Sequence, residues 1–125
     1  PVGHKYPGKA PIELSEIHSL VKRSGGCKLI LAHFGGGLPF FASLKKEMRE
    51  SLANVRFDTA AMPFIFDPAA LRLGADLLGP ESFLHGSDHP LLGTARYEKY
   101  LAAAKLTPEE ISLVMGENAK NFLGL

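Results

Sequence analysis

The feature that most constrains the fold of this 125-residue chain is a set of three short apolar runs. Each run is followed by glycine or ionisable residues and then by a helix-like segment. The runs are residues 28–32 ("KLILA"), the stretch "NVRFDTA" from Asn54, and "SFLH" from Ser82. Residues 28–32 are a nearly continuous apolar run, which is typical of a strand that is covered on both faces in a parallel sheet. Their alternation with helices predicts βα units with right-handed crossovers, and therefore an α/β fold with parallel strands.

The segments between the runs carry helix signals. Gly25 and Gly26 stop one such segment, in which apolar residues recur at helical spacing. Thr107 precedes a proline and two glutamates, which predicts a side-chain cap at the start of a helix. No repeat, low-complexity tract or long linker divides the chain, so a single domain over residues 1–125 is expected. The predicted helices are 12–24, 39–52, 68–78, 95–104 and 117–123.

Composition argues against several classes of protein. Apolar residues make up 46% and charged residues 22%, without the run of about 18 apolar positions that a membrane span needs. Lys and Arg number 14 against 13 Asp and Glu, and no basic stripe is present. We therefore expect neither nucleic acid nor membrane as a partner, and a small-molecule substrate instead. The lone Cys27 cannot form an internal disulfide, which fits a cytoplasmic protein.

Ionisable side chains follow all three predicted strands: His33, Asp58, and the group His85, Asp88 and His89. Because the carboxyl ends of parallel strands meet at one edge of a sheet, these side chains are expected to share one rim. Structural alternatives stand beside this interpretation. A histidine after an apolar strand can be a core residue, Asp88 can cap its own turn, and Asp58 can either cap a turn or face the site.

The functional interpretation assigns metal chemistry to Asp88. Its carboxylate is a hard ligand for a divalent metal and can take a proton from metal-bound water, while His89 would orient it or contact substrate. The glycines 35–37 allow either anion binding by backbone N–H groups or close approach to a ligand or a neighbouring strand. They lack the spacing of a phosphate loop or a dinucleotide fingerprint, so we favour close approach and name Gly36 as a substrate contact.

Four segments, "LILAHFGGGLPFF", "NVRFDTAAMPF", "LGPESFLHGSDHPL" and "MGENAKNFLGL", together resemble the C-terminal part of the amidohydrolase-related (amidohydrolase 2) family, which includes aminocarboxymuconate semialdehyde decarboxylase. The resemblance spans nearly the whole chain. It implies a (β/α)8 TIM-type barrel with one divalent metal, usually zinc. The implied function is that of a metal-dependent hydrolase or non-oxidative decarboxylase acting on a small carboxylated or carbonyl substrate.

The resemblance also implies roles for individual residues. Asp88 matches the metal ligand on the eighth barrel strand, and His33 matches the sixth-strand histidine that activates water or polarises substrate. His89 stands where tyrosine is common, which implies a different substrate preference. The H-x-H pair of the first strand is missing, and the fifth-strand histidine would precede Pro1, since "PVGHKYPGK" is similar to the loop after that strand.

A complete barrel of this type takes about 250 residues, so the chain is expected to form its last three βα units. Alone it should be inactive and bind metal weakly, below one equivalent. The strands 28–32 and 82–85 would lie at open sheet edges, which predicts a homo-oligomer. The alternative is a non-catalytic α/β module for anion binding or assembly, in which glycines 35–37 bind the anion and His33 and Asp88 only form hydrogen bonds.

Overall fold

The computed structural model describes Pro7 and residues 12–125, so most of the predicted opening loop lies outside the described residues. Its three strands form one parallel sheet in the order β1 (Leu29–Leu31), β2 (Val55–Asp58) and β3 (Phe83–Leu84). Leu31 lies opposite Phe57, and Phe57 lies opposite Phe83. The predicted α/β class and parallel pairing are thus confirmed, with shorter strands than expected.

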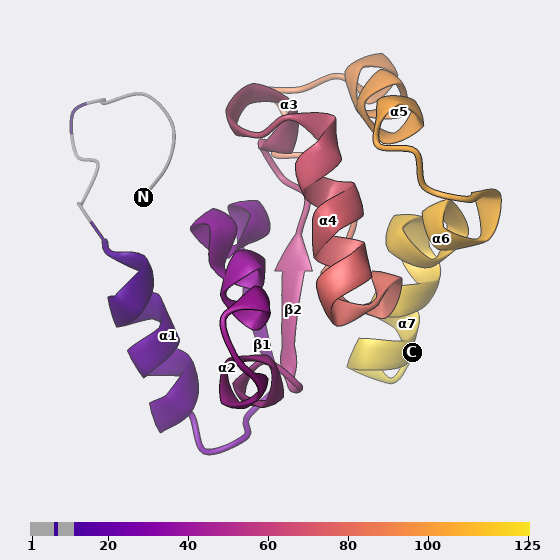
Figure 1. Cartoon of the computed structure of the whole chain (residues 1–125). Coiled ribbons are helices and arrows are strands. Elements are labelled where there is room, and N and C mark those ends of the chain that lie inside the picture. Colours follow the sequence, from indigo (N-terminus) through magenta and orange to yellow (C-terminus); the bar gives the residue numbers. More distant parts are fainter. Residues whose placement is uncertain (1–6, 8–11) are drawn as a thin grey trace.

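Helical segments connect the strands, and α4 and the segment before α2 lie in front of the sheet in Figure 1. The segment η1 (His33–Ser43) opens with a left-handed turn over residues 33–37 and continues as 3-10 helix. The short segment η2 (Pro80–Ser82) is a 3-10 helix, and η3 (Leu113–Glu117) is a π-helical turn. Among the described residues, no helix is long and apolar enough to cross a membrane. The helical elements are α1 (Leu14–Arg23), η1 (His33–Ser43), α2 (Lys46–Ser51), α3 (Met62–Ile65), α4 (Pro68–Leu78), η2 (Pro80–Ser82), α5 (Thr94–Ala103), α6 (Pro108–Ser112), η3 (Leu113–Glu117) and α7 (Asn118–Leu123).

Most helix boundaries follow the signals in the sequence. Helix α1 ends before Gly25, which takes a left-handed φ of 62° that ends a right-handed helix without a Cβ penalty. Helix α4 covers the predicted residues 68–78, and the Asp67 side chain accepts a hydrogen bond from the Ala69 N–H at 2.9 Å. The Thr107 hydroxyl accepts from the Glu110 N–H, and the Glu110 carboxylate accepts from the Thr107 N–H, as in a capping box.

The predicted helix 39–52 is wrong as a single element. The chain instead forms η1 as far as Ser43 and resumes as α2 only after Lys45, whose backbone is extended. The Ser43 hydroxyl donates to the carbonyl oxygen of Phe40 at 2.7 Å, so a side chain takes an acceptor that a continuing helix would use. The apolar spacing of this segment gave no sign of that competition.

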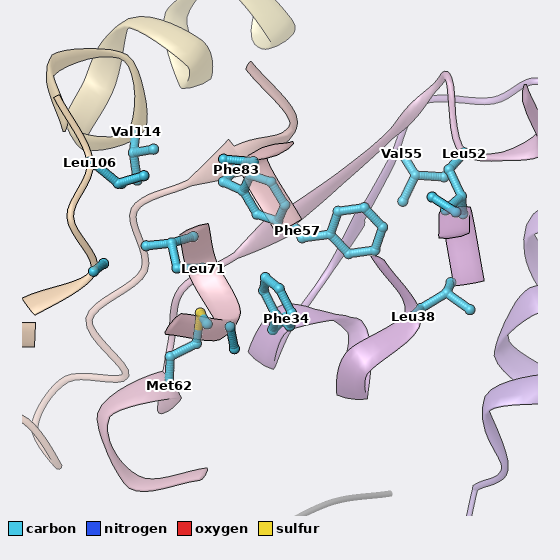
Figure 2. Close-up of a cluster of buried hydrophobic side chains, with 14 of the residues drawn as sticks. Phe34, Leu38, Leu52, Val55, Phe57, Met62, Leu71, Phe83, Leu106 and Val114 are labelled. Carbon is cyan, nitrogen blue, oxygen red and sulfur yellow. The ribbon is translucent and has the colours of Figure 1, made fainter. Parts of the chain in front are cut away.

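Three phenylalanines, Phe34, Phe57 and Phe83, form the centre of the core, and all are fully buried (Figure 2). The rings of Phe34 and Phe83 stack with centroids 5.4 Å apart. A Cβ atom on Gly74 of α4 would lie 2.7 Å from the Phe83 ring and 2.9 Å from the Phe34 ring. Glycine at this position therefore lets α4 pack closely against Phe83 of the sheet and against Phe34, which follows His33.

The two edges of the sheet differ. At β3, the outward Phe83 carbonyl accepts a hydrogen bond from the Asn118 side chain at 2.8 Å, and the His85 N–H donates to the Val114 carbonyl at 2.8 Å. The prediction of an open edge at residues 82–85 is therefore wrong, because the C-terminal segment covers it. At β1, the Leu29 N–H donates to the Asn54 carbonyl, which directs the backbone groups of Ile30 away from β2. The Ile30 side chain is 46% exposed.

Candidate functional site at the carboxyl ends of the strands

His33 begins the turn that follows β1. Its φ is 57°, in the left-handed region that non-glycine residues seldom adopt. Its N–H donates to Oδ1 of Asp58, at the end of β2, at 2.7 Å. The residue is exposed, so the imidazole lies at the surface of the rim while its backbone is held by the neighbouring strand.

The glycines after His33 continue the left-handed turn. Phe34 and the glycines 35–37 have φ between 54° and 99°. A Cβ atom on Gly35 would lie 2.9 Å from the Phe57 ring, so this glycine serves the close approach to a neighbouring strand that we favoured. Gly36 is buried within the turn, and its contact with substrate remains a prediction.

The end of β2 contributes Asp58 and Thr59. Oδ1 of Asp58 also accepts from the Ala60 N–H at 3.1 Å, so this carboxylate both caps its own turn and binds the His33 backbone. The Thr59 hydroxyl accepts from the Gly86 N–H at 3.1 Å, which ties the end of β2 to the loop after β3. The site is therefore assembled from three consecutive strand ends.

Asp88 lies in the loop after β3, half-buried and with a φ of 53°. The loop is held by its backbone and by Ser87: the Asp88 carbonyl accepts from the Leu91 N–H, and the Ser87 hydroxyl accepts from the His89 N–H at 3.3 Å. Within the described part of the chain, the Asp88 carboxylate itself makes no hydrogen bond. The side chain that caps this turn is therefore that of Ser87, not that of Asp88. His89 is exposed on the same loop.

Tyr97 of α5 is a site neighbour that the sequence analysis missed. It is 2% exposed, and its hydroxyl donates to the Thr59 carbonyl at 3.0 Å. Burial, together with the negative charges of Asp88 and Asp58, raises the pKa of Tyr97 to about 12. Its spacing with other apolar residues of α5 is the pattern of an ordinary core residue, and nothing in the sequence marks it as part of a site.

His85 fits the structural alternative rather than a surface role. Its ring meets the Tyr97 ring edge-on, with centroids 5.2 Å apart and an interplanar angle of 87°. Burial lowers the pKa of His85, and Nδ1 is buried with no hydrogen-bond partner among the described residues. We therefore interpret His85 as a neutral imidazole that packs against Tyr97 beneath the rim.

The described residues supply part of a metal site. They contain no group of three His, Cys, Asp or Glu side chains that could hold a metal ion. Asp88 offers a carboxylate that makes no hydrogen bond to any described residue, and His33 offers an exposed imidazole, while Asp58 accepts hydrogen bonds from two N–H groups. The donor chemistry suits a divalent cation, but the set falls short of the three or four protein ligands usual for a closed site.

Solved structures similar to this one share its fold. A 5-carboxyvanillate decarboxylase from Sphingomonas paucimobilis matches with a TM-score of 0.71 and 23% identity, over 90% of this chain and 38% of its own. A dihydroxybenzoic acid decarboxylase from Polaromonas sp. JS666, solved with manganese and 2-nitroresorcinol, matches with a TM-score of 0.70 and 18% identity, over 90% and 38%. An amidohydrolase from Burkholderia multivorans with bound zinc gives 0.57 and 21%, over 90% and 49%.

These likenesses show that the three βα units have the fold of part of a TIM-type barrel. The chain spans about 38% of the length of each of the two decarboxylases. No curated protein matches the chain. A model of the amidohydrolase family matches residues 7–125, which is nearly the whole sequence. The chain therefore belongs to the amidohydrolase family.

Proposed function

We propose that residues 1–125 are the C-terminal portion of a metal-dependent amidohydrolase-family enzyme, either a hydrolase or a non-oxidative decarboxylase. The substrate would be a small carboxylated or carbonyl compound in the cytoplasm. Family membership supports this proposal, and two structures of similar fold are named as decarboxylases of aromatic acids. The observation that carries it is the half-buried Asp88 carboxylate, which has no hydrogen-bond partner among the described residues and lies in the loop after a parallel strand.

Within the proposed enzyme, Asp88 would be a metal ligand and a proton acceptor, and His33 would donate and accept protons at the substrate. A divalent metal held there would polarise a substrate oxygen or lower the pKa of a water. Structures of similar fold contain manganese or zinc, and we propose zinc for this chain. Gly36 and His89 would contact substrate from the loops after β1 and β3.

The described residues offer too few ligands to complete the site. We therefore propose that the 125-residue chain is inactive, binds metal well below one equivalent, and self-associates through the exposed edge of β1. The non-catalytic anion-binding alternative finds little support, because glycines 35–37 are buried and Gly35 packs against Phe57.

Substitution of the two rim residues in a complete barrel tests the proposed function. Asp88→Ala should lose both bound metal and turnover, because a ligand is removed. His33→Ala should keep most of the metal and lose turnover. Since the Asp88 carboxylate makes no hydrogen bond in the described chain, its removal should change the free energy of unfolding by only about 0.5 kcal/mol, so that lost activity is not lost folding.

Metal content by elemental analysis and turnover of carboxylated aromatic acids are the measurements. Asp76→Ala is the matched control, since Asp76 is an exposed aspartate on α4 whose carboxylate pairs with Arg72. Full activity in Asp88→Ala or His33→Ala would refute the assignment. Loss of metal in His33→Ala would make His33 a direct ligand instead.

A further inference from the structure

We propose that Asp58 is a positioning residue, which fixes the His33 imidazole at the rim by holding the His33 backbone in its left-handed conformation. This inference rests on the acid–base role proposed for His33. Asp58 itself need not touch substrate. Its Oδ1 accepts the His33 N–H at 2.7 Å across two neighbouring strands, 25 residues apart in the sequence.

The conformation of His33 requires such support. A φ of 57° is unfavourable for a residue with a Cβ atom and persists where the surroundings hold it. A hydrogen bond to a carboxylate is stronger than one to a neutral acceptor, and this one is short. The second bond to the same oxygen, from the Ala60 N–H at 3.1 Å, fixes the orientation of the carboxylate.

The far side of the turn is held by packing. Phe34 is fully buried, and its ring lies against the rings of Phe57 and Phe83. Gly35 packs against Phe57, the residue that immediately precedes Asp58. Two successive residues of β2 therefore hold the turn, Phe57 beneath Gly35 and Asp58 at the His33 N–H.

Without the hydrogen bond to Asp58, the peptide group that carries the His33 N–H would be the part of the turn that can reorient. The side chain that follows this peptide is the proposed proton donor and acceptor. Misplacement of a catalytic group by about 1 Å can cost about 100-fold in rate. Removing the Asp58 acceptor should therefore lower kcat with little effect on KM or metal content.

Asparagine and alanine separate the hydrogen bond from the charge. Asp58→Asn keeps an oxygen acceptor at the δ position and loses the negative charge, while Asp58→Ala loses both. Asp58→Ser is a second loss variant that keeps a polar side chain, and its shorter hydroxyl does not occupy the δ position. It replaces Asp58→Ala if that variant does not fold.

Amide hydrogen exchange at His33, followed by NMR on this chain, tests the contact without any activity. Exchange should be slow in the wild type and in Asp58→Asn, and at least about 10-fold faster in Asp58→Ala or Asp58→Ser. Asp67→Ala is the matched control, because Asp67 likewise accepts a backbone N–H, that of Ala69, but at α4. Unchanged exchange at His33 in Asp58→Ala and Asp58→Ser would overturn the inference.

Kinetics in a complete barrel test the consequence. Asp58→Ala should lower kcat by about 10- to 100-fold with KM and metal content nearly unchanged, and Asp58→Asn should recover most of it. Equal losses in both variants would show a role of the charge and overturn the positioning role. If His33→Ala were fully active while the exchange results held, the proposed function would fail and the contact would stand.

Discussion

The side chain of Asn118 donates a hydrogen bond to the carbonyl oxygen of Phe83 at 2.8 Å and so closes the outer edge of β3. Its amide also donates to the Pro80 carbonyl at 2.9 Å, and the residue is 4% exposed. One side chain of α7 thus supplies a hydrogen bond that a neighbouring strand would otherwise make, and the Val114 carbonyl supplies another at His85.

Replacement of Asn118 by alanine should lower the free energy of unfolding by about 1–3 kcal/mol, because the buried Phe83 carbonyl loses its partner. Urea unfolding of the chain measures the change. Asn54→Ala is the control, since the Asn54 amide donates to the Gly26 carbonyl at 3.0 Å in an exposed setting, where water replaces the lost donor. Equal losses in the two variants would contradict a special role of the β3 edge.

Gly74→Ala and Gly116→Ala should change stability in opposite directions. At Gly74 a methyl group would overlap the rings of Phe83 and Phe34, which predicts a loss of about 1–3 kcal/mol despite the better helix propensity of alanine. At Gly116 no described residue lies within 4 Å of the added Cβ, so alanine should add about 0.4–1 kcal/mol. Thermal unfolding of both variants checks the signs, and a more stable Gly74→Ala would refute the described packing of α4 on the sheet.

Acid should weaken the link between α4 and α6. Arg72 binds the Glu110 carboxylate through two N–H···O contacts of 2.6 and 3.0 Å. Hydrogen bonding to Arg72, and then to the Thr107 N–H, lowers the pKa of Glu110. A lowered folded-state pKa means that the stabilisation is complete above the unfolded value of about 4.3 and is lost as the pH falls through the folded value.

Glu110→Gln should therefore destabilise the chain by about 1 kcal/mol near neutral pH and by much less near pH 3. Glutamine keeps the acceptor of the Thr107 capping box, so the ion pair is the main change. Urea unfolding at the two pH values gives the difference. Glu50→Gln, which disrupts the exposed Lys46–Glu50 pair, serves as control. An equal loss of stability in Glu50→Gln would contradict a specific contribution of the Arg72–Glu110 pair.

Ile30→Lys should reduce self-association of the 125-residue chain. Ile30 presents a 46% exposed side chain on β1, and a charge on an edge strand opposes pairing with another copy. Light scattering at micromolar concentration should show a smaller particle than the wild type. Leu73→Lys on α4, at 53% exposure, is the matched control and should leave the size unchanged. A wild-type monomer would refute the proposed oligomer.

The sequence predicted those parts of the fold that depend on local signals. Gly25 stops α1, α4 covers residues 68–78, and Thr107 caps α6, as expected from the local sequence. The parallel sheet followed from the alternation of apolar runs with helices. His33 and Asp88 could be placed beyond strand ends because that placement needs only the strand assignments.

The remaining features depend on residues distant in sequence. The bond from Asn118 to Phe83 spans 35 residues, and an asparagine near the start of a helix gives no sign of its partner. Tyr97 reaches Thr59 over 38 residues, so only the folded chain brings it to the rim. The break after Ser43 is local, but it depends on the hydrogen bond from the Ser43 hydroxyl to the Phe40 carbonyl. The spacing of apolar residues carries no information about that bond.

The stacked rings of Phe34 and Phe83 belong to the first and last of the three βα units, and Phe57 of the middle unit packs against both. A solenoid divides its core among repeats, so that its ends can fray independently. Here the described residues of all three units contribute to one hydrophobic cluster. The consequence is thermodynamic: the three units share one unfolding transition, and a core substitution in any one of them lowers the melting temperature of all three.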